Sequence, residues 1–427
     1  MTQRLSSALR VARETQACVI GSGVLAEVPT LFNDCFGAQE WQPLVVADPR
    51  TMAVAGESVK QALGAESMLL DAPQLYAEMV HVETVMARLA QQNRFVPVAV
   101  GSGTINDVAK LAAGRLGRPY MVVATAASMD GYSAYGASIT AKGLKQTFSC
   151  AAPRAIVADL EVMRLAPPEM VAAGYADLLA KVVAGADWLL ADAIGVEPLD
   201  KVAWGIVQQG LREVLAEPAA IAAGEHGAFG RFVEGLMLGG FAMQWLQSSR
   251  PASGAEHQFS HLWDMDGHKV NGVAPSHGFK VGVATHYVAA LYERLLSWPM
   301  ERVDIAACVV SWPELAEIEG EIERLFSGSV VGELAWSEIR EKYVDREVVA
   351  LQLQRLKQIW PELKMHLREQ LLTADEMAQR LRVAGAAVLP EEIGIASGAM
   401  AQYARRAMFI RRRFTIFDVA WRLGIPL

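Results

Sequence analysis

The first 165 residues alternate short apolar runs with segments of helical spacing, and this alternation constrains the fold most strongly. The apolar runs have four to six residues, are often β-branched and end at Gly, Asp or Thr; they lie at residues 17–21, 43–48, 67–71, 96–101, 120–125 and 155–159. Helical spacing is found at residues 25–36, 51–63, 73–92 and 107–116. Strands and helices in alternation predict βαβ units and a mostly parallel sheet covered on both faces.

The pattern changes after Pro167-Pro168, where strand-like runs nearly disappear. Helical periodicity is found at residues 170–190, 199–215, 229–247, 271–296, 314–325, 336–372 and 373–383. Thr373 and Glu376 have the spacing of a capping box at the start of the last segment. We therefore expect a Rossmann-like α/β domain over residues 1–166 and an all-α domain over residues 167–427, with the active site in the cleft between them.

Composition excludes several classes of protein. Lys and Arg number 39 against 47 Asp and Glu, giving a net charge of −8, and no basic block is present, which argues against a nucleic-acid partner. Hydrophobic residues make up 52%, yet no run approaches the ~20 apolar residues of a spanning helix, so we expect no membrane insertion. The N-terminus has no apolar signal region, and the four cysteines are far apart. We expect a cytoplasmic protein that forms a homo-oligomer.

Two Gly-Ser-Gly triplets follow predicted strands. The first triplet runs from Gly21 to Gly23, and Asp48 lies at the end of the next predicted strand. The second triplet runs from Gly101 to Gly103 and begins a predicted helix. Glycines at such a turn let the backbone approach a pyrophosphate at the helix N-terminus, and a carboxylate after the second strand can bind a ribose diol. The pattern predicts a dinucleotide but does not indicate which loop holds the phosphates. Asp48 favours NAD over NADP, because a carboxylate repels a 2′-phosphate.

A third segment places polar side chains after a predicted strand. Thr125, Ser128 and Asp130 follow residues 120–124, where parallel-sheet proteins place ligands. Ordinary turn chemistry is the alternative explanation. We favour a functional role because the segment follows a glycine loop.

Five of the eight histidines lie within thirty residues, at His257, His261, His268, His277 and His286. His257 and His261 have i, i+4 spacing, which places two imidazoles on one helix face and suits a divalent metal with a carboxylate from elsewhere. Spacing alone does not decide which two histidines bind. It also leaves the acid partner open, the candidates being Asp177, Asp187, Asp264 and Asp266.

Taken together, these motifs resemble the sn-glycerol-1-phosphate dehydrogenase family. That family lies within the group of iron-containing alcohol dehydrogenases, glycerol dehydrogenases and dehydroquinate synthases. The resemblance runs from about Cys18 to the end of the chain and rests on segments 101–110, 125–131, 174–181, 253–261, 277–282 and 413–424, in this order. The sequence departs from common family patterns at Ser102 and Ala176, where many members have Gly, and neither change removes a functional group.

The resemblance implies a role for each matching residue of the metal site. Asp177, His257 and His277 match the family's metal ligands, and His261 would be a neighbour able to relay a proton. Such a set suits Zn²⁺, Ni²⁺ or Fe²⁺, and the ligand types do not distinguish among them.

The same resemblance implies cofactor and substrate residues. The cofactor-phosphate loop would consist of Gly101, Ser102, Gly103, Thr104 and Asp107. Flanking the cofactor would be Thr125 and Ser128, with Asp48 on the adenosine ribose. The substrate would contact Asp130 at its hydroxyls and Arg250 at its phosphate.

The implied reaction is reversible, metal-dependent reduction of dihydroxyacetone phosphate to sn-glycerol 1-phosphate by NADH or NADPH. In such a reaction, one divalent ion polarises the substrate carbonyl while the cofactor supplies hydride. The alternatives are a dehydrogenase of glycerol or another polyol, a lyase similar to dehydroquinate synthase, and an inactive scaffold that keeps the fold.

Overall fold

The computed structural model describes residues 2–427, which divide into two compact units. Unit 1 contains residues up to Leu178 together with Val202–Ser249 and Val383–Gly385. Unit 2 contains Leu179–Lys201, Arg250–Arg382 and Ala386–Leu427. These units are defined by spatial contact and each combines separate stretches of chain. The functional division predicted at residues 166 and 167 therefore stays a prediction.

Unit 1 is built on a six-stranded parallel sheet with the order β1-β8-β5-β4-β2-β3. Its strands are β1 (Ala17–Gly21), β2 (Gln42–Ala47), β3 (Glu66–Leu69), β4 (Phe95–Gly101), β5 (Met121–Ala124) and β8 (Ala155–Asp159). All six lie where the apolar runs predicted strands. The predicted α/β domain with a parallel sheet, followed by a helical part, is confirmed.

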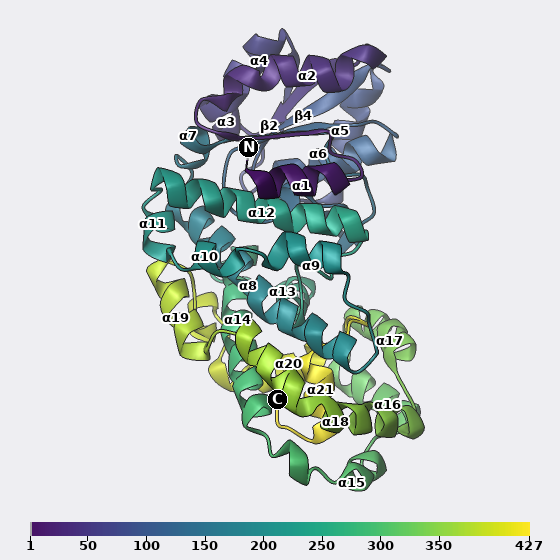
Figure 1. Cartoon of the computed structure of the whole chain (residues 1–427). Coiled ribbons are helices and arrows are strands. Elements are labelled where there is room, and N and C mark those ends of the chain that lie inside the picture. The colour runs from purple at the N-terminus through teal and green to yellow at the C-terminus, as the bar shows by residue number, and fades with distance from the viewer. Residues whose placement is uncertain (1) are drawn as a thin grey trace. The chain divides into compact units, whose positions relative to one another are not determined.

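Helices cover both faces of this sheet, as Figure 1 shows. On one face, α2 (Val28–Phe36) and α4 (Glu57–Leu63) pack on alternate residues of β4, Val96, Val98 and Val100. On the other face lie α5 (Met79–Ala90) and α6 (Gly103–Arg115). All seven residues of β4 are buried, as expected for a central strand covered twice.

An antiparallel hairpin, β6 (Ala137–Ala141) with β7 (Leu144–Phe148), was not predicted. It explains why the helix predicted at residues 73–92 begins only at Met79. Glu78 and Thr140 form a β-bridge, and the Thr140 N–H donates to the Ala77 carbonyl at 2.8 Å. The chain before Met79 is thus held extended by the hairpin.

The remaining helices of unit 1 are mostly short. They are α1 (Gln3–Val11), η1 (Val24–Glu27), η2 (Gly37–Gln39), α3 (Pro49–Thr51), η3 (Met52–Gly56), η4 (Gly131–Ser133), α7 (Leu160–Met163), α9 (Lys201–Gln208), α10 (Leu211–Leu215), α11 (Pro218–Ala222) and α12 (His226–Leu246). The helix predicted at residues 199–215 is divided at Gly210, whose φ of 71° is left-handed. The long helix α8 (Pro168–Ala193) contributes residues to both units.

Unit 2 is helical. Its other elements are α13 (Ala255–Met265), α14 (His277–Ser297), η5 (Met300–Arg302), α15 (Ile305–Val310), α16 (Leu315–Leu325), α17 (Val331–Lys342), α18 (Arg346–Gln370), α19 (Ala374–Val383), η6 (Pro390–Ile393), η7 (Ser397–Ala399), α20 (Met400–Ala407) and α21 (Ile416–Leu423). The predicted capping box is present: the Glu376 N–H donates to Thr373 Oγ1 at 3.2 Å and the Thr373 N–H donates to Glu376 Oε2 at 2.9 Å. Asp345 caps α18 and divides the helix predicted at residues 336–372. Within residues 2–427, each helix is too short or too polar to span a bilayer.

Candidate functional site

One carboxylate and two imidazoles converge in the described part of the chain. Asp177 on α8, His257 on α13 and His277 at the first position of α14 each offer a ligand atom, and these atoms lie within 4.8 Å of one another. Asp177 and His257 are buried, and His277 is partly buried. This donor set suits a divalent transition metal, because a carboxylate and two neutral imidazoles leave coordination positions open.

Neighbouring groups orient the two imidazoles. The Nδ1–H of His257 donates to Glu256 Oε1 at 2.7 Å, which leaves Nε2 for a metal. Nδ1 of His277 lies 3.2 Å from Ser260 Oγ, and the two ring centroids are 5.3 Å apart. The His261 ring lies 6.4 Å from that of His257, outside the ligand group but close enough to be its neighbour.

The other acids considered from the sequence are engaged elsewhere. Asp187 accepts hydrogen bonds from Tyr292 Oη at 2.6 Å and from the Ala255 N–H at 2.7 Å. Asp264 forms an ion pair with Lys280. Asp266 binds both terminal nitrogens of Arg406, at 2.6 and 2.7 Å. Of the four candidates, Asp177 is the one placed with the histidines.

The two glycine loops differ in what their backbone amides bind. In the first loop, Asp159 at the end of β8 accepts from the N–H groups of Gly23 and Leu25, at 3.2 and 3.0 Å. In the second loop, Ser102 precedes α6 with extended backbone, and no described side chain caps this helix. A Cβ at Gly101 would lie 2.5 Å from Ile105 Cβ, so the turn requires glycine. The open helix N-terminus belongs to the second loop.

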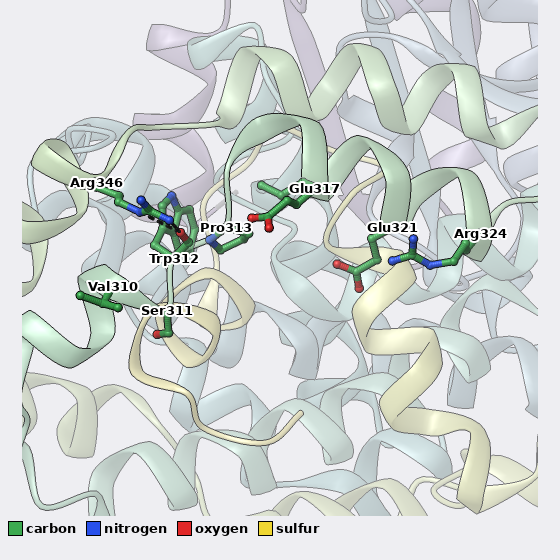
Figure 2. Close-up of a pocket in the computed structure, with 9 residues that line it drawn as sticks. Val310, Ser311, Trp312, Pro313, Glu317, Glu321, Arg324 and Arg346 are labelled. Atoms are coloured by element: carbon green, nitrogen blue, oxygen red, sulfur yellow. Dashed lines mark hydrogen bonds between the residues drawn. The ribbon is translucent and has the colours of Figure 1, made fainter.

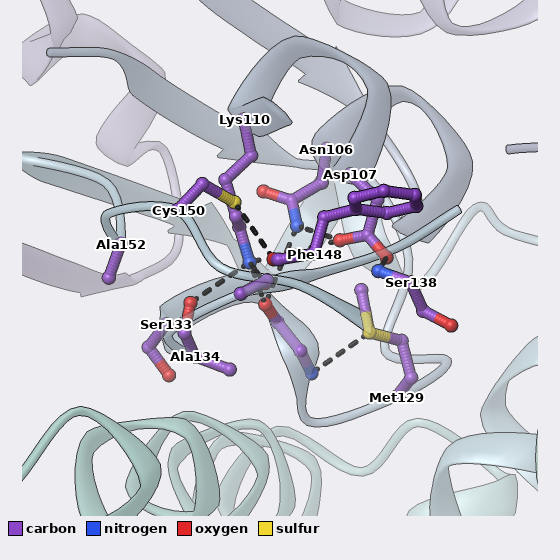
Figure 3. A network of polar contacts seen from close by, with 12 residues as sticks. Asn106, Asp107, Lys110, Met129, Ser133, Ala134, Ser138, Phe148, Cys150 and Ala152 are labelled. Carbon is purple, nitrogen blue, oxygen red and sulfur yellow. Dashed lines mark hydrogen bonds and ion pairs between the residues drawn. The ribbon is translucent and has the colours of Figure 1, made fainter. Parts of the chain in front are cut away.

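A buried lysine links α6 to the segment after β5 (Figure 3). Lys110 Nζ donates to the carbonyls of Gly131, Ala134 and Gly136, at 2.8, 3.0 and 3.0 Å. Asp107, one turn earlier, accepts from the Ser138 N–H at 3.1 Å, and burial raises the pKa of its carboxyl. Asp107 therefore contacts the β6–β7 hairpin, while Ser102, Gly103 and Thr104 form the first turn.

The polar segment after β5 lies beside one of the candidate metal ligands. The Asp130 N–H donates to Asp177 Oδ2 at 3.0 Å, and the Thr125 N–H donates to the Gly101 carbonyl at 3.1 Å. Ser128 lies near the Tyr132 hydroxyl, which donates to the Ala126 carbonyl at 2.7 Å. This segment therefore connects the second glycine loop with Asp177, and its role in ligand binding stays a prediction.

Asp48 lies where the sequence placed it, directly after β2. Its carboxylate caps α3, accepting from the N–H groups of Arg50 and Thr51 at 2.8 and 3.0 Å, and it is partly exposed. A ribose diol would have to share this carboxylate with the cap.

Arg250 is almost fully buried, with 1% of its surface exposed. Its guanidinium donates to the Asp187 carbonyl at 3.0 Å and forms an ion pair with Glu197 at 3.0 Å. A substrate phosphate at Arg250 would have to compete with Glu197 for the same group.

A surface pocket of about 440 Å³ lies in unit 2, beside α16. Figure 2 shows its lining, in which Arg346 lies beside Trp312 and Glu321 lies beside Arg324, with Glu317 between the two pairs. None of the side chains drawn there is a predicted site residue.

Sequence reasoning gave no role to two residues that the structure places at these sites. Glu256 directly precedes His257, and that adjacency was the available signal for it. No sequence signal pointed to Asp159, since the amides that it binds are more than 130 residues away in the chain.

Comparisons with known proteins agree with the family resemblance found in the sequence. Residues 19–167 match the family model described as iron-containing alcohol dehydrogenase. Named glycerol-1-phosphate dehydrogenase (NAD(P)+), the protein of Geobacillus thermodenitrificans is 30% identical over 359 residues, covering 82% of this chain and 79% of that protein. The Pyrococcus abyssi protein of the same name is 35% identical, covering 64% of this chain and 78% of that one.

Two further similarities differ in extent. The Halalkalibacterium halodurans protein, also named glycerol-1-phosphate dehydrogenase (NAD(P)+), is 36% identical, but the match spans only 64% of its length and 58% of this chain. The solved structure of NADH-dependent butanol dehydrogenase A from Thermotoga maritima superposes with a TM-score of 0.60 over 97% of both chains at 14% identity, a likeness of fold alone. The Geobacillus and Pyrococcus matches carry the assignment: this chain belongs to the glycerol-1-phosphate dehydrogenase family of iron-containing alcohol dehydrogenases.

Proposed function

We propose that this protein catalyses the reversible, metal-dependent reduction of dihydroxyacetone phosphate to sn-glycerol 1-phosphate with NADH or NADPH. The observation that carries the proposal is the convergence of Asp177, His257 and His277 in a chain whose relatives are named glycerol-1-phosphate dehydrogenase. The match with the Halalkalibacterium halodurans relative spans 64% of that protein's length.

The three ligand residues would hold one divalent ion, which when bound supplies Lewis-acid polarisation of a carbonyl oxygen. Glu256 keeps the proton on Nδ1 of His257, so that the ring presents Nε2. The Asp130 N–H fixes Asp177 Oδ2, which orients the other carboxylate oxygen. The ring centroid of His261 lies 6.4 Å from that of His257 and 6.3 Å from that of His277, and we propose that His261 relays a proton to the substrate oxygen.

We assign the cofactor phosphates to the second glycine loop, Gly101, Ser102, Gly103 and Thr104. Its helix N-terminus is open, and a helix of this length favours an anion there. In the first loop the amides of Gly23 and Leu25 already bind a carboxylate. Thr125 and Ser128 follow the neighbouring strand and would line the same cofactor, with Asp48 at the adenosine ribose.

The test is a substrate-by-cofactor panel on protein stripped with a chelator and reloaded with Zn²⁺, Ni²⁺ or Fe²⁺. We expect NADH or NADPH oxidation with dihydroxyacetone phosphate, dependent on added metal and much faster than with dihydroxyacetone. His277→Ala should abolish both metal binding and turnover, whereas His366→Ala, on the exposed face of α18, should leave both unchanged.

Each alternative gives a different result in this panel. Equal rates with the unphosphorylated ketone would identify a polyol dehydrogenase, a reading that the engagement of Arg250 by Glu197 keeps open. Product formation without net change in NADH would identify a lyase. Metal binding without turnover on any substrate would indicate a scaffold.

We also propose a reducing cytoplasm as the compartment, since all four cysteines are free in the described structure. A homo-oligomer is proposed for the working state, and light scattering of the metal-loaded protein would test it.

A further inference from the structure

Glu256 is a fully buried carboxylate that touches a candidate metal ligand, with none of its surface exposed. Its Oε1 accepts two hydrogen bonds of 2.7 Å, from the Nδ1–H of His257 and from the Gly254 N–H. Because His257 is the next residue and lies in the first turn of α13, the two side chains are held at one end of that helix.

The second oxygen of Glu256 faces another acid. A Cβ built on Gly254 would lie 2.9 Å from Glu256 Oε2 and 2.5 Å from Asp187 Oδ2, so both oxygens border the same small space. Glu256 Oε2 has no hydrogen-bond partner among the described residues. Burial, and after it the charge of Glu256, raises the pKa of Asp187 to about 7. Two buried acids side by side cost stability.

A neutral side chain would suit this position better. A glutamine at position 256 could keep both bonds to Oε1, and its amide N–H₂ would lie where Oε2 now faces Asp187. The amide could then donate to Asp187 Oδ2, replacing a like-charge contact with a hydrogen bond. The two hydrogen bonds to Oε1 therefore do not require a charged residue at position 256, and the cation that its charge favours, the Arg413 guanidinium, has further acidic support from Glu197.

We propose that Glu256 is a positioning residue for the metal, whose negative charge strengthens His257 as a ligand. A carboxylate on Nδ1–H fixes the tautomer and ring orientation and raises the basicity of Nε2. Only the charge separates Glu from Gln here, because the geometry of the two bonds can be the same. The inference rests on the proposed metal site and is independent of the substrate.

The experiment compares Glu256→Gln with the wild-type protein in two measurements. Zn²⁺ affinity of the metal-free protein is determined by competition with a chromophoric chelator, and thermal stability of the same metal-free sample is determined by circular dichroism. We expect the Zn²⁺ dissociation constant to rise about 10- to 100-fold, as for other residues that support a ligand, while the metal-free melting temperature is unchanged or higher.

Glu234→Gln is the matched control. Glu234 is also a buried glutamate, with 7% exposure, but it accepts a hydrogen bond from Thr2 Oγ1 at 2.7 Å and contacts no proposed ligand. It should leave Zn²⁺ affinity unchanged. Co²⁺ substitution adds a spectroscopic check: the visible absorption of the Co²⁺ protein should shift in Glu256→Gln and not in Glu234→Gln.

Unchanged Zn²⁺ affinity in Glu256→Gln would overturn the inference, as would a loss of affinity that is matched by a fall in metal-free stability. If the wild-type protein binds Zn²⁺ but does not reduce dihydroxyacetone phosphate, the proposed reaction fails and the role of Glu256 stands. If it reduces the substrate and Glu256→Gln binds Zn²⁺ normally, the role of Glu256 fails alone.

Discussion

Gly174 lies on α8 one turn before Asp177, at a point where the helix touches the segment after β5. A Cβ there would lie 2.0 Å from the Ala127 carbonyl oxygen, 2.9 Å from its carbon and 3.1 Å from the Phe232 ring. The nearest atoms belong to backbone, which cannot rotate away as a flexible side chain could. Gly174→Ala must therefore displace either the helix or the segment that carries Asp130.

Helix propensity predicts the opposite sign for this change. Alanine is favoured over glycine inside a helix by about 1 kcal/mol. Gly205→Ala on α9 is the matched control, because a Cβ there meets nothing within 4 Å, and it should stabilise the protein by up to about that amount. Overpacking costs about 1–3 kcal/mol and sometimes more, and the contact with a backbone oxygen places Gly174→Ala at the upper end, about 3 kcal/mol.

Urea unfolding followed by tryptophan fluorescence gives the free energy of unfolding of both variants. The transition midpoints are compared using the same dependence of this free energy on urea concentration. Gly174→Ala should unfold at lower urea than wild type and Gly205→Ala at equal or higher urea. The displaced segment should also lower kcat of the metal-loaded enzyme, since the Asp130 N–H would no longer hold Asp177. A Gly174→Ala protein within about 0.5 kcal/mol of wild type would refute the reasoning.

Three further predictions concern stability. Lys110→Met keeps the apolar stem but removes the donor to the carbonyls of Ala134 and Gly136, while Gly131 keeps longer hydrogen bonds from Asn106 and from the Ala134 N–H. Urea unfolding should show a loss of about 2–3 kcal/mol, and an unchanged midpoint would contradict this. Burial raises the pKa of the Cys18 thiol from 9.0 to about 12, so the unfolded chain loses this proton first and stability should fall above pH 9, by about 1.4 kcal/mol per pH unit from this group. Because the pKa of Cys150 is also raised to about 12, Cys18→Ala should reduce the slope by that amount and leave the part due to Cys150. Thr373→Ala removes the cap of α19 and should cost about 1 kcal/mol by thermal unfolding, whereas Thr84→Ala, at an exposed position inside α5, should be neutral or slightly stabilising.

The parallel sheet could be predicted from sequence because its strands carry their own signal. Val96, Val98 and Val100 are buried on one face and Ala99 on the other, so the run is apolar throughout. The hairpin at residues 137–148 carries no such signal. Thr140, Lys145 and Thr147 are polar or partly exposed. Lys145 and Thr147 pair across the hairpin with Thr140 and Ser138, and Thr140 also pairs with the distant Glu78.

The candidate site divides in the same way. The clustering of histidines indicated a metal site in the region of His257 and His277, but four acids remained candidates for the carboxylate ligand. Only the family resemblance selected Asp177 among them. The structure separates these acids by their partners: Lys280 for Asp264 and Arg406 for Asp266. Arg406 lies 140 residues from Asp266 and Lys280 lies on the helix that follows Asp264, and residue spacing alone predicts neither ion pair.

Because Asp159 accepts hydrogen bonds from the first glycine loop only, the backbone amides of the two loops should differ in their rates of hydrogen exchange with solvent. It holds the amides of Gly23 and Leu25 whether or not nucleotide is present, so those protons should exchange slowly in deuterated water and respond little to NADH. The first-turn amides of α6 should exchange fast in the free enzyme and slow when the cofactor binds. The first loop, although its sequence resembles a nucleotide site, thus connects the ends of β1 and β8 through hydrogen bonds. The exchange rates of the amide protons would show which of the two loops binds the cofactor.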